Sequence, residues 1–233
     1  MPAPFLPSRD GFAFSNSWPS QPGIVLPFRG RNIGIGNAAR GLCGGMVFAA
    51  LDYWHAGIAP PPARPAAGTP LYQFIVRRLI DSWHIPAGVA RYYLWMNRPD
   101  ADYRARRPGR GAGPERPGLR QLSVRQQWPR IRASIDAGKP AALGVVTVAS
   151  AWPGLLGRNH QVLAYAYEQA GSAVNLAVYD PNSGPDDGIR VVFDAGRRAA
   201  GPAGPGFEHN LSIGWPVRGF FLTGYSPAAP PPR

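Results

Sequence analysis

The stretch GLCGGMVFAALDYWHAG, residues 41–57, decides how this chain is interpreted. It holds the only cysteine of the 233 residues, Cys43, with glycines on both sides and a long apolar run behind it. In that run the apolar residues recur at helical spacing rather than alternating, and Gly57 is well suited to end a helix. The sequence therefore predicts a helix that begins near Cys43 and ends near His55.

Two more helices and then a series of strands are expected further along. Thr69 and Pro70 are typical of a helix start, and an apolar face follows them in LYQFIVRRLIDSW. A third helix is expected after Ser123, and Pro129 either disturbs it or marks its real start. The chain then becomes β-branched and alternating. The expected strands are PAALGVVTVAS (140–150), HQVLAYAYEQ (160–169), SAVNLAVYD (172–180), GIRVVFD (188–194) and VRGFFLTGY (217–225).

This order of elements predicts an α+β fold. The helical part spans about 37–139 and the antiparallel sheet about 140–225, with the helices packed on one face of the sheet. Both parts belong to a single domain over residues 1–225, and the Pro-rich end SPAAPPPR, 226–233, is expected to be a disordered tail. Residues 1–40 are expected to be irregular, and residues 84–121, rich in Gly, Pro and Arg, give no clear prediction.

The charge is strongly positive, with 25 basic and 13 acidic residues and a net charge of +12. Nearly all of the cations are arginines, and they are densest in residues 98–132. Such a region either binds an anionic partner, such as a nucleic acid, or forms a solvated Arg-rich surface. The second interpretation is favoured, because no aromatic stacking motif is interleaved with these arginines.

The sequence gives no sign of a membrane protein or of Sec export. The N-terminal residues lack a basic segment followed by an apolar one, and no run of about 18 apolar residues occurs. We therefore expect no membrane span and, by default, a cytoplasmic location. Export by a dedicated secretion system leaves no mark of this kind, and the oligomeric state is left open.

Cys43 lies where a nucleophilic cysteine is best placed. The thiolate is the reactive form, and the free N–H groups and dipole of a helix N-terminus stabilise it. A base and an orienting group are also needed. His160 begins one expected strand and Asp180 ends the next; with QAGS as the turn between them, His160 lies opposite about residue 181, beside Asp180. Asn182 is the other candidate for orienting His160.

Each of these residues also has an ordinary structural interpretation. Cys43 suits a small buried apolar position, His160 a strand end on the surface, and Asp180 the start of a turn. Gly44 and Gly45 are poor helix formers, and we expect them to leave room for a substrate backbone. Asn159 and Gln161, which flank His160, need no function. No group of residues has metal-ligand spacing, so neither a metal nor another cofactor is expected.

The motifs GLCGGM, NHQVLAYAY and VYDPNSG together resemble the papain-like cysteine peptidase superfamily, closest to the double-glycine-leader peptidases of bacterial exporters. In that superfamily the cysteine opens a helix, and the histidine and an Asn or Asp follow from a sheet in the same chain order. The resemblance implies a papain-like fold and a Cys43–His160–Asp180 triad. A Gln six residues before the cysteine helps to form the oxyanion hole there. This chain has Asn37 at that position, which can donate the same N–H bond from an arm one methylene shorter.

The resemblance implies a cysteine-dependent hydrolase, a peptidase or amidase, that acts on a peptide or protein through a thioester intermediate. Transfer of the acyl group to an amine, as in transglutaminases and acyltransferases, uses the same chemistry. A hypothesis from another class is a non-catalytic papain-like module that binds an anionic partner through residues 98–132.

Overall fold

The computed structural model describes residues 3–18, 22–28, 31–37, 41–107, 110–196 and 206–232, with the backbone alone for 22–28, 31–37, 105–107 and 110–112. The helices are α1 (Pro7–Asp10), α2 (Cys43–Ala56), α3 (Pro70–Ser82), α4 (Ala87–Met96), α5 (Leu119–Gln121), the π-helical η1 (Leu122–Gln127), α6 (Trp128–Asp136) and the 3-10 helix η2 (Pro153–Arg158). The strands are β1 (Pro22–Phe28), β2 (Arg31–Asn37), β3 (Tyr103–Arg107), β4 (Arg110–Arg116), β5 (Ala141–Val146), β6 (His160–Ala170), β7 (Ala173–Tyr179), β8 (Arg190–Asp194), β9 (Glu208–His209) and β10 (Gly219–Leu222).

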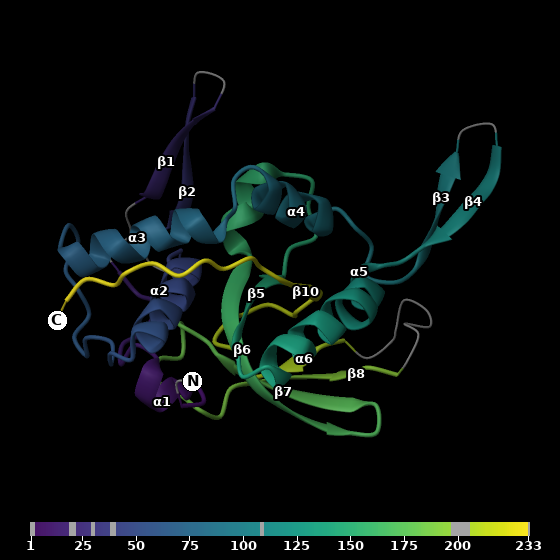
Figure 1. Ribbon diagram of the computed structural model, residues 1–233. Coiled ribbons are helices and arrows are strands. Elements are labelled where there is room, and N and C mark those ends of the chain that lie inside the picture. Colours follow the sequence, from purple (N-terminus) through teal and green to yellow (C-terminus); the bar gives the residue numbers. More distant parts are fainter. Residues whose placement is uncertain are drawn as a thin grey trace.

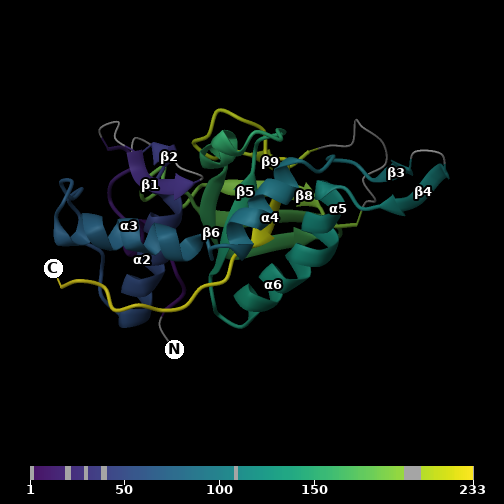
Figure 2. The same ribbon diagram turned by 90° about the horizontal axis from the view of Figure 1, so that it is seen from above.

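The main sheet is antiparallel. In the described part of the chain its six strands have the order β10-β5-β6-β7-β8-β9, and the sheet is curled (Figures 1 and 2). β1 with β2 and β3 with β4 form two separate hairpins, of which β3–β4 projects from the body of the molecule in both views. The predicted mixed α+β class is confirmed, with most helices before the sheet in the chain.

Helices cover both faces of this sheet, whereas the sequence predicted one covered face. Neighbouring residues of β5 alternate between two cores, because successive side chains of a strand point to opposite faces. Ala142 packs with α2 and α3 in one core, whereas Leu143 packs with Trp128 and Ile131 of α6 in the other. The strand pattern identified the sheet but not the second layer, which the helix η1–α6 supplies.

The helix predicted to begin at Cys43 is confirmed, as is the helix that begins at Pro70. Residues 1–40, expected to be irregular, contain α1 and the hairpin β1–β2, and residues 84–121, for which no element was predicted, contain α4, α5 and the hairpin β3–β4. Pro129 lies in the first turn of α6, where its missing N–H costs little, and the π-helical η1 leads directly into it.

The glycines after Cys43 serve packing rather than access. A Cβ atom on Gly45 would collide with the main-chain carbonyl of Ile75 in α3, and one on Gly44 would collide with the side chains of Ser82 and Gln161. The space that we expected for a substrate backbone is therefore occupied by the protein itself. These two residues let α2 approach α3 and β6 at short range, which fixes the end of α2 that carries Cys43.

The C-terminal residues 223–232 form a strap along α2 and α3, in place of the disordered tail expected from their composition (Figure 1). Thr223 extends the β10–β5 pairing by bonding the Ala142 carbonyl, and Tyr53 in α2 donates its hydroxyl to the Pro231 carbonyl at 3.0 Å. Proline cannot donate a main-chain N–H, but its carbonyl still accepts, so a Pro-rich segment can be held by donors from the helices.

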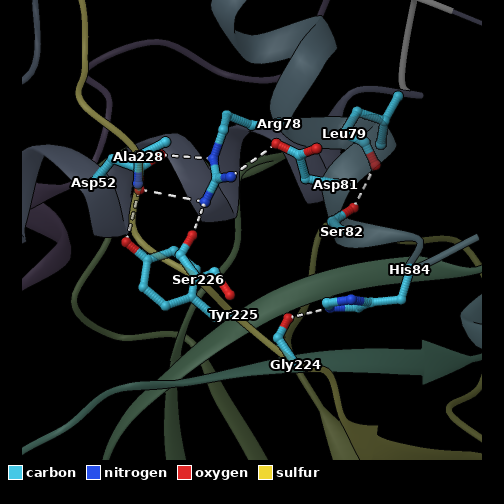
Figure 3. A network of polar contacts seen from close by, with 10 residues as sticks. All are labelled: Asp52, Arg78, Leu79, Asp81, Ser82, His84, Gly224, Tyr225, Ser226 and Ala228. Carbon is cyan, nitrogen blue, oxygen red and sulfur yellow. Dashed lines mark hydrogen bonds and ion pairs between the residues drawn. The ribbon is translucent and has the colours of Figure 1, made fainter.

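The strap is fastened to a buried ion pair between Asp52 of α2 and Arg78 of α3 (Figure 3). Arg78 Nε lies 2.7 Å from Asp52 Oδ2, and Arg78 Nη2 donates to the Ser226 carbonyl at 2.7 Å. Asp52 Oδ1 accepts from the Tyr225 hydroxyl at 2.7 Å and from the Ala228 N–H at 2.9 Å. Burial raises the pKa of Asp52, while the bonds from Ala228, Tyr225 and Arg78 act in the opposite direction. The network thus joins two helices and the strap through one carboxylate.

Candidate active site

Cys43 is the first residue of α2, in a position that leaves main-chain donors free around it. The first hydrogen bond within the helix runs from the Met46 N–H to the Leu42 carbonyl at 2.9 Å. The N–H groups of Cys43, Gly44 and Gly45 consequently have no partner inside the helix. They give this end of α2 a partial positive charge, which favours a thiolate or a developing oxyanion beside it.

His160 and Asp180 form a buried pair behind the cysteine. His160 Nε2 lies 2.7 Å from Asp180 Oδ1, and the two side chains are 4% and 0% exposed. The carboxylate also accepts main-chain bonds, from Asn182 N–H to Oδ1 at 2.9 Å and from Ser212 N–H to Oδ2 at 2.8 Å. The side-chain amide of Asn182 is used elsewhere, on Asn16 and on the Ser212 carbonyl. The structure therefore places the side chain of Asp180, and not that of Asn182, on His160.

The strand register that joins these residues differs from the predicted one. Pairing runs through Ala170↔Ala173 at the turn, shifts at a bulge between Ala164 and Ala166, and continues through Leu163↔Tyr179. Near the site this differs by one residue from the predicted pairing of His160 with about residue 181. Because side chains alternate, the observed register puts Asp180 on the same sheet face as His160, whereas the predicted register would have separated them.

The electrostatics of the three residues are coupled. Burial alone would lower the pKa of His160, but the negative charges of Asp180 and Cys43, with hydrogen bonds to both, raise it to about 10. Burial would raise the pKa of Asp180, and the charge of His160 with the surrounding hydrogen bonds lowers it instead. With Nε2 on Asp180, the other ring nitrogen, Nδ1, is the one left for the thiol. The arrangement can hold a charged imidazole between a carboxylate and a thiolate.

A pocket opens beside Cys43, and its polar residues are ones for which the sequence predicted no function. It encloses about 550 Å³, part of it open to solvent, and Tyr92, Asn159 and Gln161 contribute to its wall. Gln161, which we expected to need no function, is 3% exposed and lies against Gly44. Tyr92 comes from the aromatic run RYYLW in α4. The run is visible in the sequence, but nothing in the sequence shows that it packs beside His160.

Asn37, the predicted oxyanion donor, is the last residue of β2. Its backbone pairs with Pro22, but its side chain lies outside the described residues, so the predicted role stays a prediction. β2 itself lies against η2, whose residues Leu156 and Gly157 belong to the wall of the pocket.

No three His, Cys, Asp or Glu residues in the described part of the chain gather as a metal site. The Arg-rich segment 98–132 contains the projecting hairpin β3–β4 and the helix η1–α6. Its first arginine, Arg98, bonds the Pro117 carbonyl at the base of that hairpin at 2.8 Å. Among the described helices, none is both long and apolar enough to cross a membrane.

Comparisons with known proteins found no relative of this chain. No protein-family model, no curated protein and no solved structure matches the chain.

Proposed function

We propose that this protein is a cysteine-dependent hydrolase of papain-like type, a peptidase or amidase. The observation that carries the proposal is the buried His160–Asp180 pair, 2.7 Å between Nε2 and Oδ1, together with the hydrogen bond and charge interaction between His160 and Cys43 at a helix N-terminus. A nucleophile, a base and a group that orients the base are the parts that acyl transfer through a thioester requires.

In the proposed mechanism, His160 Nδ1 takes the proton of the Cys43 thiol. The thiolate attacks the acyl carbon of an amide, and the oxyanion is held by the Cys43 N–H and, as predicted, by the Asn37 side chain; one such donor contributes about 3 kcal/mol in comparable sites. The C–N bond then breaks, and the imidazolium gives its proton to the leaving amine. His160 next takes a proton from water, whose oxygen attacks the thioester; the acid leaves and the thiolate returns.

Acyl transfer to an amine would follow the same path, with the amine in place of water. Binding of an anionic partner through residues 98–132 is compatible with either activity and stays a prediction. Hydrolysis is proposed because water is the nucleophile that is always present.

The test is the pH dependence of Cys43 alkylation by iodoacetamide. At pH 6 we expect the wild type to react on the order of 100-fold faster than His160→Ala, because the imidazolium holds a thiolate that a free cysteine almost lacks at this pH. His55→Ala, an exposed histidine at the other end of the same helix, is the matched control and should react like the wild type. Equal, slow alkylation of folded wild type and His160→Ala at pH 6 would overturn the proposal.

A further inference from the structure

The pocket beside Cys43 has a wall of distinct chemistry. Apolar side chains come from three elements: Leu79 from α3, Val89 from α4 and Leu156 from η2, with Trp83 between the first two. Apart from Cys43, none of the described residues that line it carries a basic or acidic side chain, although the chain as a whole has a net charge of +12. An anion placed here would lose its hydration and would meet the proposed thiolate instead of a counter-charge. The wall therefore suits a neutral, mainly apolar group.

The side-chain amides and the tyrosine hydroxyl of the wall are already engaged, with one exception. Asn159 accepts from the Thr147 N–H at 3.2 Å and donates to the Leu156 carbonyl at 3.0 Å. The Tyr92 hydroxyl donates to the His160 carbonyl at 3.2 Å. Gln161 Nε2 donates to Ser82 Oγ at 3.1 Å, but no described group donates to Gln161 Oε1, which is buried.

The neighbours of Gln161 fix which way its amide points. The Ser82 hydroxyl gives its hydrogen to the Leu79 carbonyl, and the Tyr92 hydroxyl gives its hydrogen to the His160 carbonyl. Both oxygens can then only accept from Gln161, so the amide nitrogen faces them and Oε1 must face away. Tyr92 and Gln161 are indeed joined by a side-chain hydrogen bond. The unpartnered atom is therefore an acceptor, and burying an acceptor without a donor costs free energy that a bound donor would recover.

We propose that this pocket selects the substrate of the proposed hydrolase: it binds a neutral, mainly apolar group, next to the carbonyl that Cys43 attacks, which carries an N–H or O–H donor for Gln161 Oε1. The inference rests on the proposed function for the identity of the nucleophile. It adds the substrate class, which excludes acidic side chains at this position.

The experiment compares alkylating probes that share one reactive carbon. The probes are phenethyl iodoacetate, which has no donor, N-phenethyl iodoacetamide with an amide N–H, 4-hydroxyphenethyl iodoacetate with a hydroxyl, and 4-carboxyphenethyl iodoacetate with a charge. Each rate constant for Cys43 is divided by that of the same probe with glutathione, which removes differences in intrinsic reactivity. At least one donor probe is expected to gain about tenfold over phenethyl iodoacetate, the effect of one net hydrogen bond, and the charged probe to lose at least as much.

Gln161→Met keeps the length of the side chain and removes the acceptor, so it should abolish the gain of the donor probes. Gln169→Met, an exposed residue of the same strand, is the matched control and should retain it. If Gln161→Met fails to fold, the comparison of the probes on the wild type still decides.

The two proposals fail in different ways. Fast, His160-dependent reaction with iodoacetamide but no gain from either donor probe, or no loss with the charged probe, overturns the pocket inference alone. Slow reaction with iodoacetamide itself at pH 6 overturns the proposed function.

Discussion

Among the residues that the structure describes, two buried ion pairs each join a carboxylate to a basic side chain but differ in what surrounds them. Asp52–Arg78 and His160–Asp180 each join two elements at 2.7 Å, and each carboxylate also accepts main-chain N–H bonds. In the first pair the donors of the cation are engaged elsewhere as well, because Arg78 also binds Asp81 and the Ser226 carbonyl. In the second pair the cation is a histidine with one nitrogen turned to a thiol.

The difference separates a pair that fixes the structure from one that can exchange a proton. A guanidinium never gives up its proton near neutral pH, and in a closed network it has no reason to move. An imidazole changes charge in this range, and an open side lets the change reach a neighbour. Burial and short distances alone therefore do not mark a reactive site. What marks it is a titratable partner, here His160, that still has a nitrogen available to a neighbouring group.

The largest effect on stability is expected from breaking the Asp52–Arg78 pair. Arg78→Met leaves Asp52 buried without its counter-charge and should lower the free energy of unfolding by about 3–5 kcal/mol. Urea denaturation measures this, with the exposed neighbour Arg77→Met as the control that should change little. A loss below about 1 kcal/mol would mean that the strap satisfies Asp52 without Arg78.

The second prediction uses pH to tell the pairs apart. The pKa of His160 is raised from 6.5 to about 10 in the folded protein, so its stabilisation is complete below pH 6.5 and is lost as the pH rises through 10. The stability difference between wild type and His160→Gln should therefore shrink above pH 6.5 by on the order of 1 kcal/mol per pH unit. The corresponding difference for Arg78→Met should stay nearly flat from pH 7 to 9. If the two stability differences changed with pH in the same way, the proposed distinction between a pair that can exchange a proton and one that cannot would be contradicted.

The third prediction concerns the charge of Asp180. Asp180→Asn keeps an oxygen for the surrounding N–H groups but removes the charge that helps to hold His160 protonated, so alkylation of Cys43 at pH 6 should slow by about tenfold. Asp186→Asn, in the loop that follows, tests a carboxylate that only accepts from the Gly188 N–H. It should react like the wild type; a slow control would point to the loop rather than to the charge.

The smallest effect on stability is expected from removing a single hydrogen bond in the network around Asp52. Tyr225→Phe removes one hydrogen bond to Asp52, whose other donors remain, so the expected loss is about 1–2 kcal/mol. Tyr93→Phe, which removes a hydroxyl bond to the Ala151 carbonyl, is the control with a smaller loss. Cys43 alkylation per folded molecule should be unchanged in both, as the strap network includes neither His160 nor Asp180.

Much of the fold was predictable from the sequence where local rules act alone. Helical spacing and end signals located α2 and α3 to within a residue or two, and alternation located β5 to β8. The hairpin β3–β4 and α4 were not predictable, because arginine and glycine give no period and pairing partners are set by contacts elsewhere. The strap was misjudged because composition shows how a segment behaves alone, and here two helices supply its hydrogen-bond donors.

The candidate site was predictable as a set of residue types but not as a geometry. Chain order and the glycine-flanked start of α2 singled out Cys43, His160 and Asp180. His160 and Asp180 lie on the same face of the sheet because a bulge near Tyr165 shifts the strand register by one residue. The sequence alternates on both sides of this bulge and so does not reveal it. Gln161 was expected to need no function for a similar reason: its burial against Ser82 comes from packing between β6 and α3.

The strap also sets an order of events during synthesis. Asp52 leaves the ribosome 173 residues before Tyr225, one of the groups that bond its carboxylate. Arg78 can pair with Asp52 much earlier, but until the strap is made the carboxylate lacks the Tyr225 hydroxyl and the Ala228 N–H, so the network around it is completed last. The helix that presents Cys43 is consequently among the first elements translated and among the last to be fixed in place.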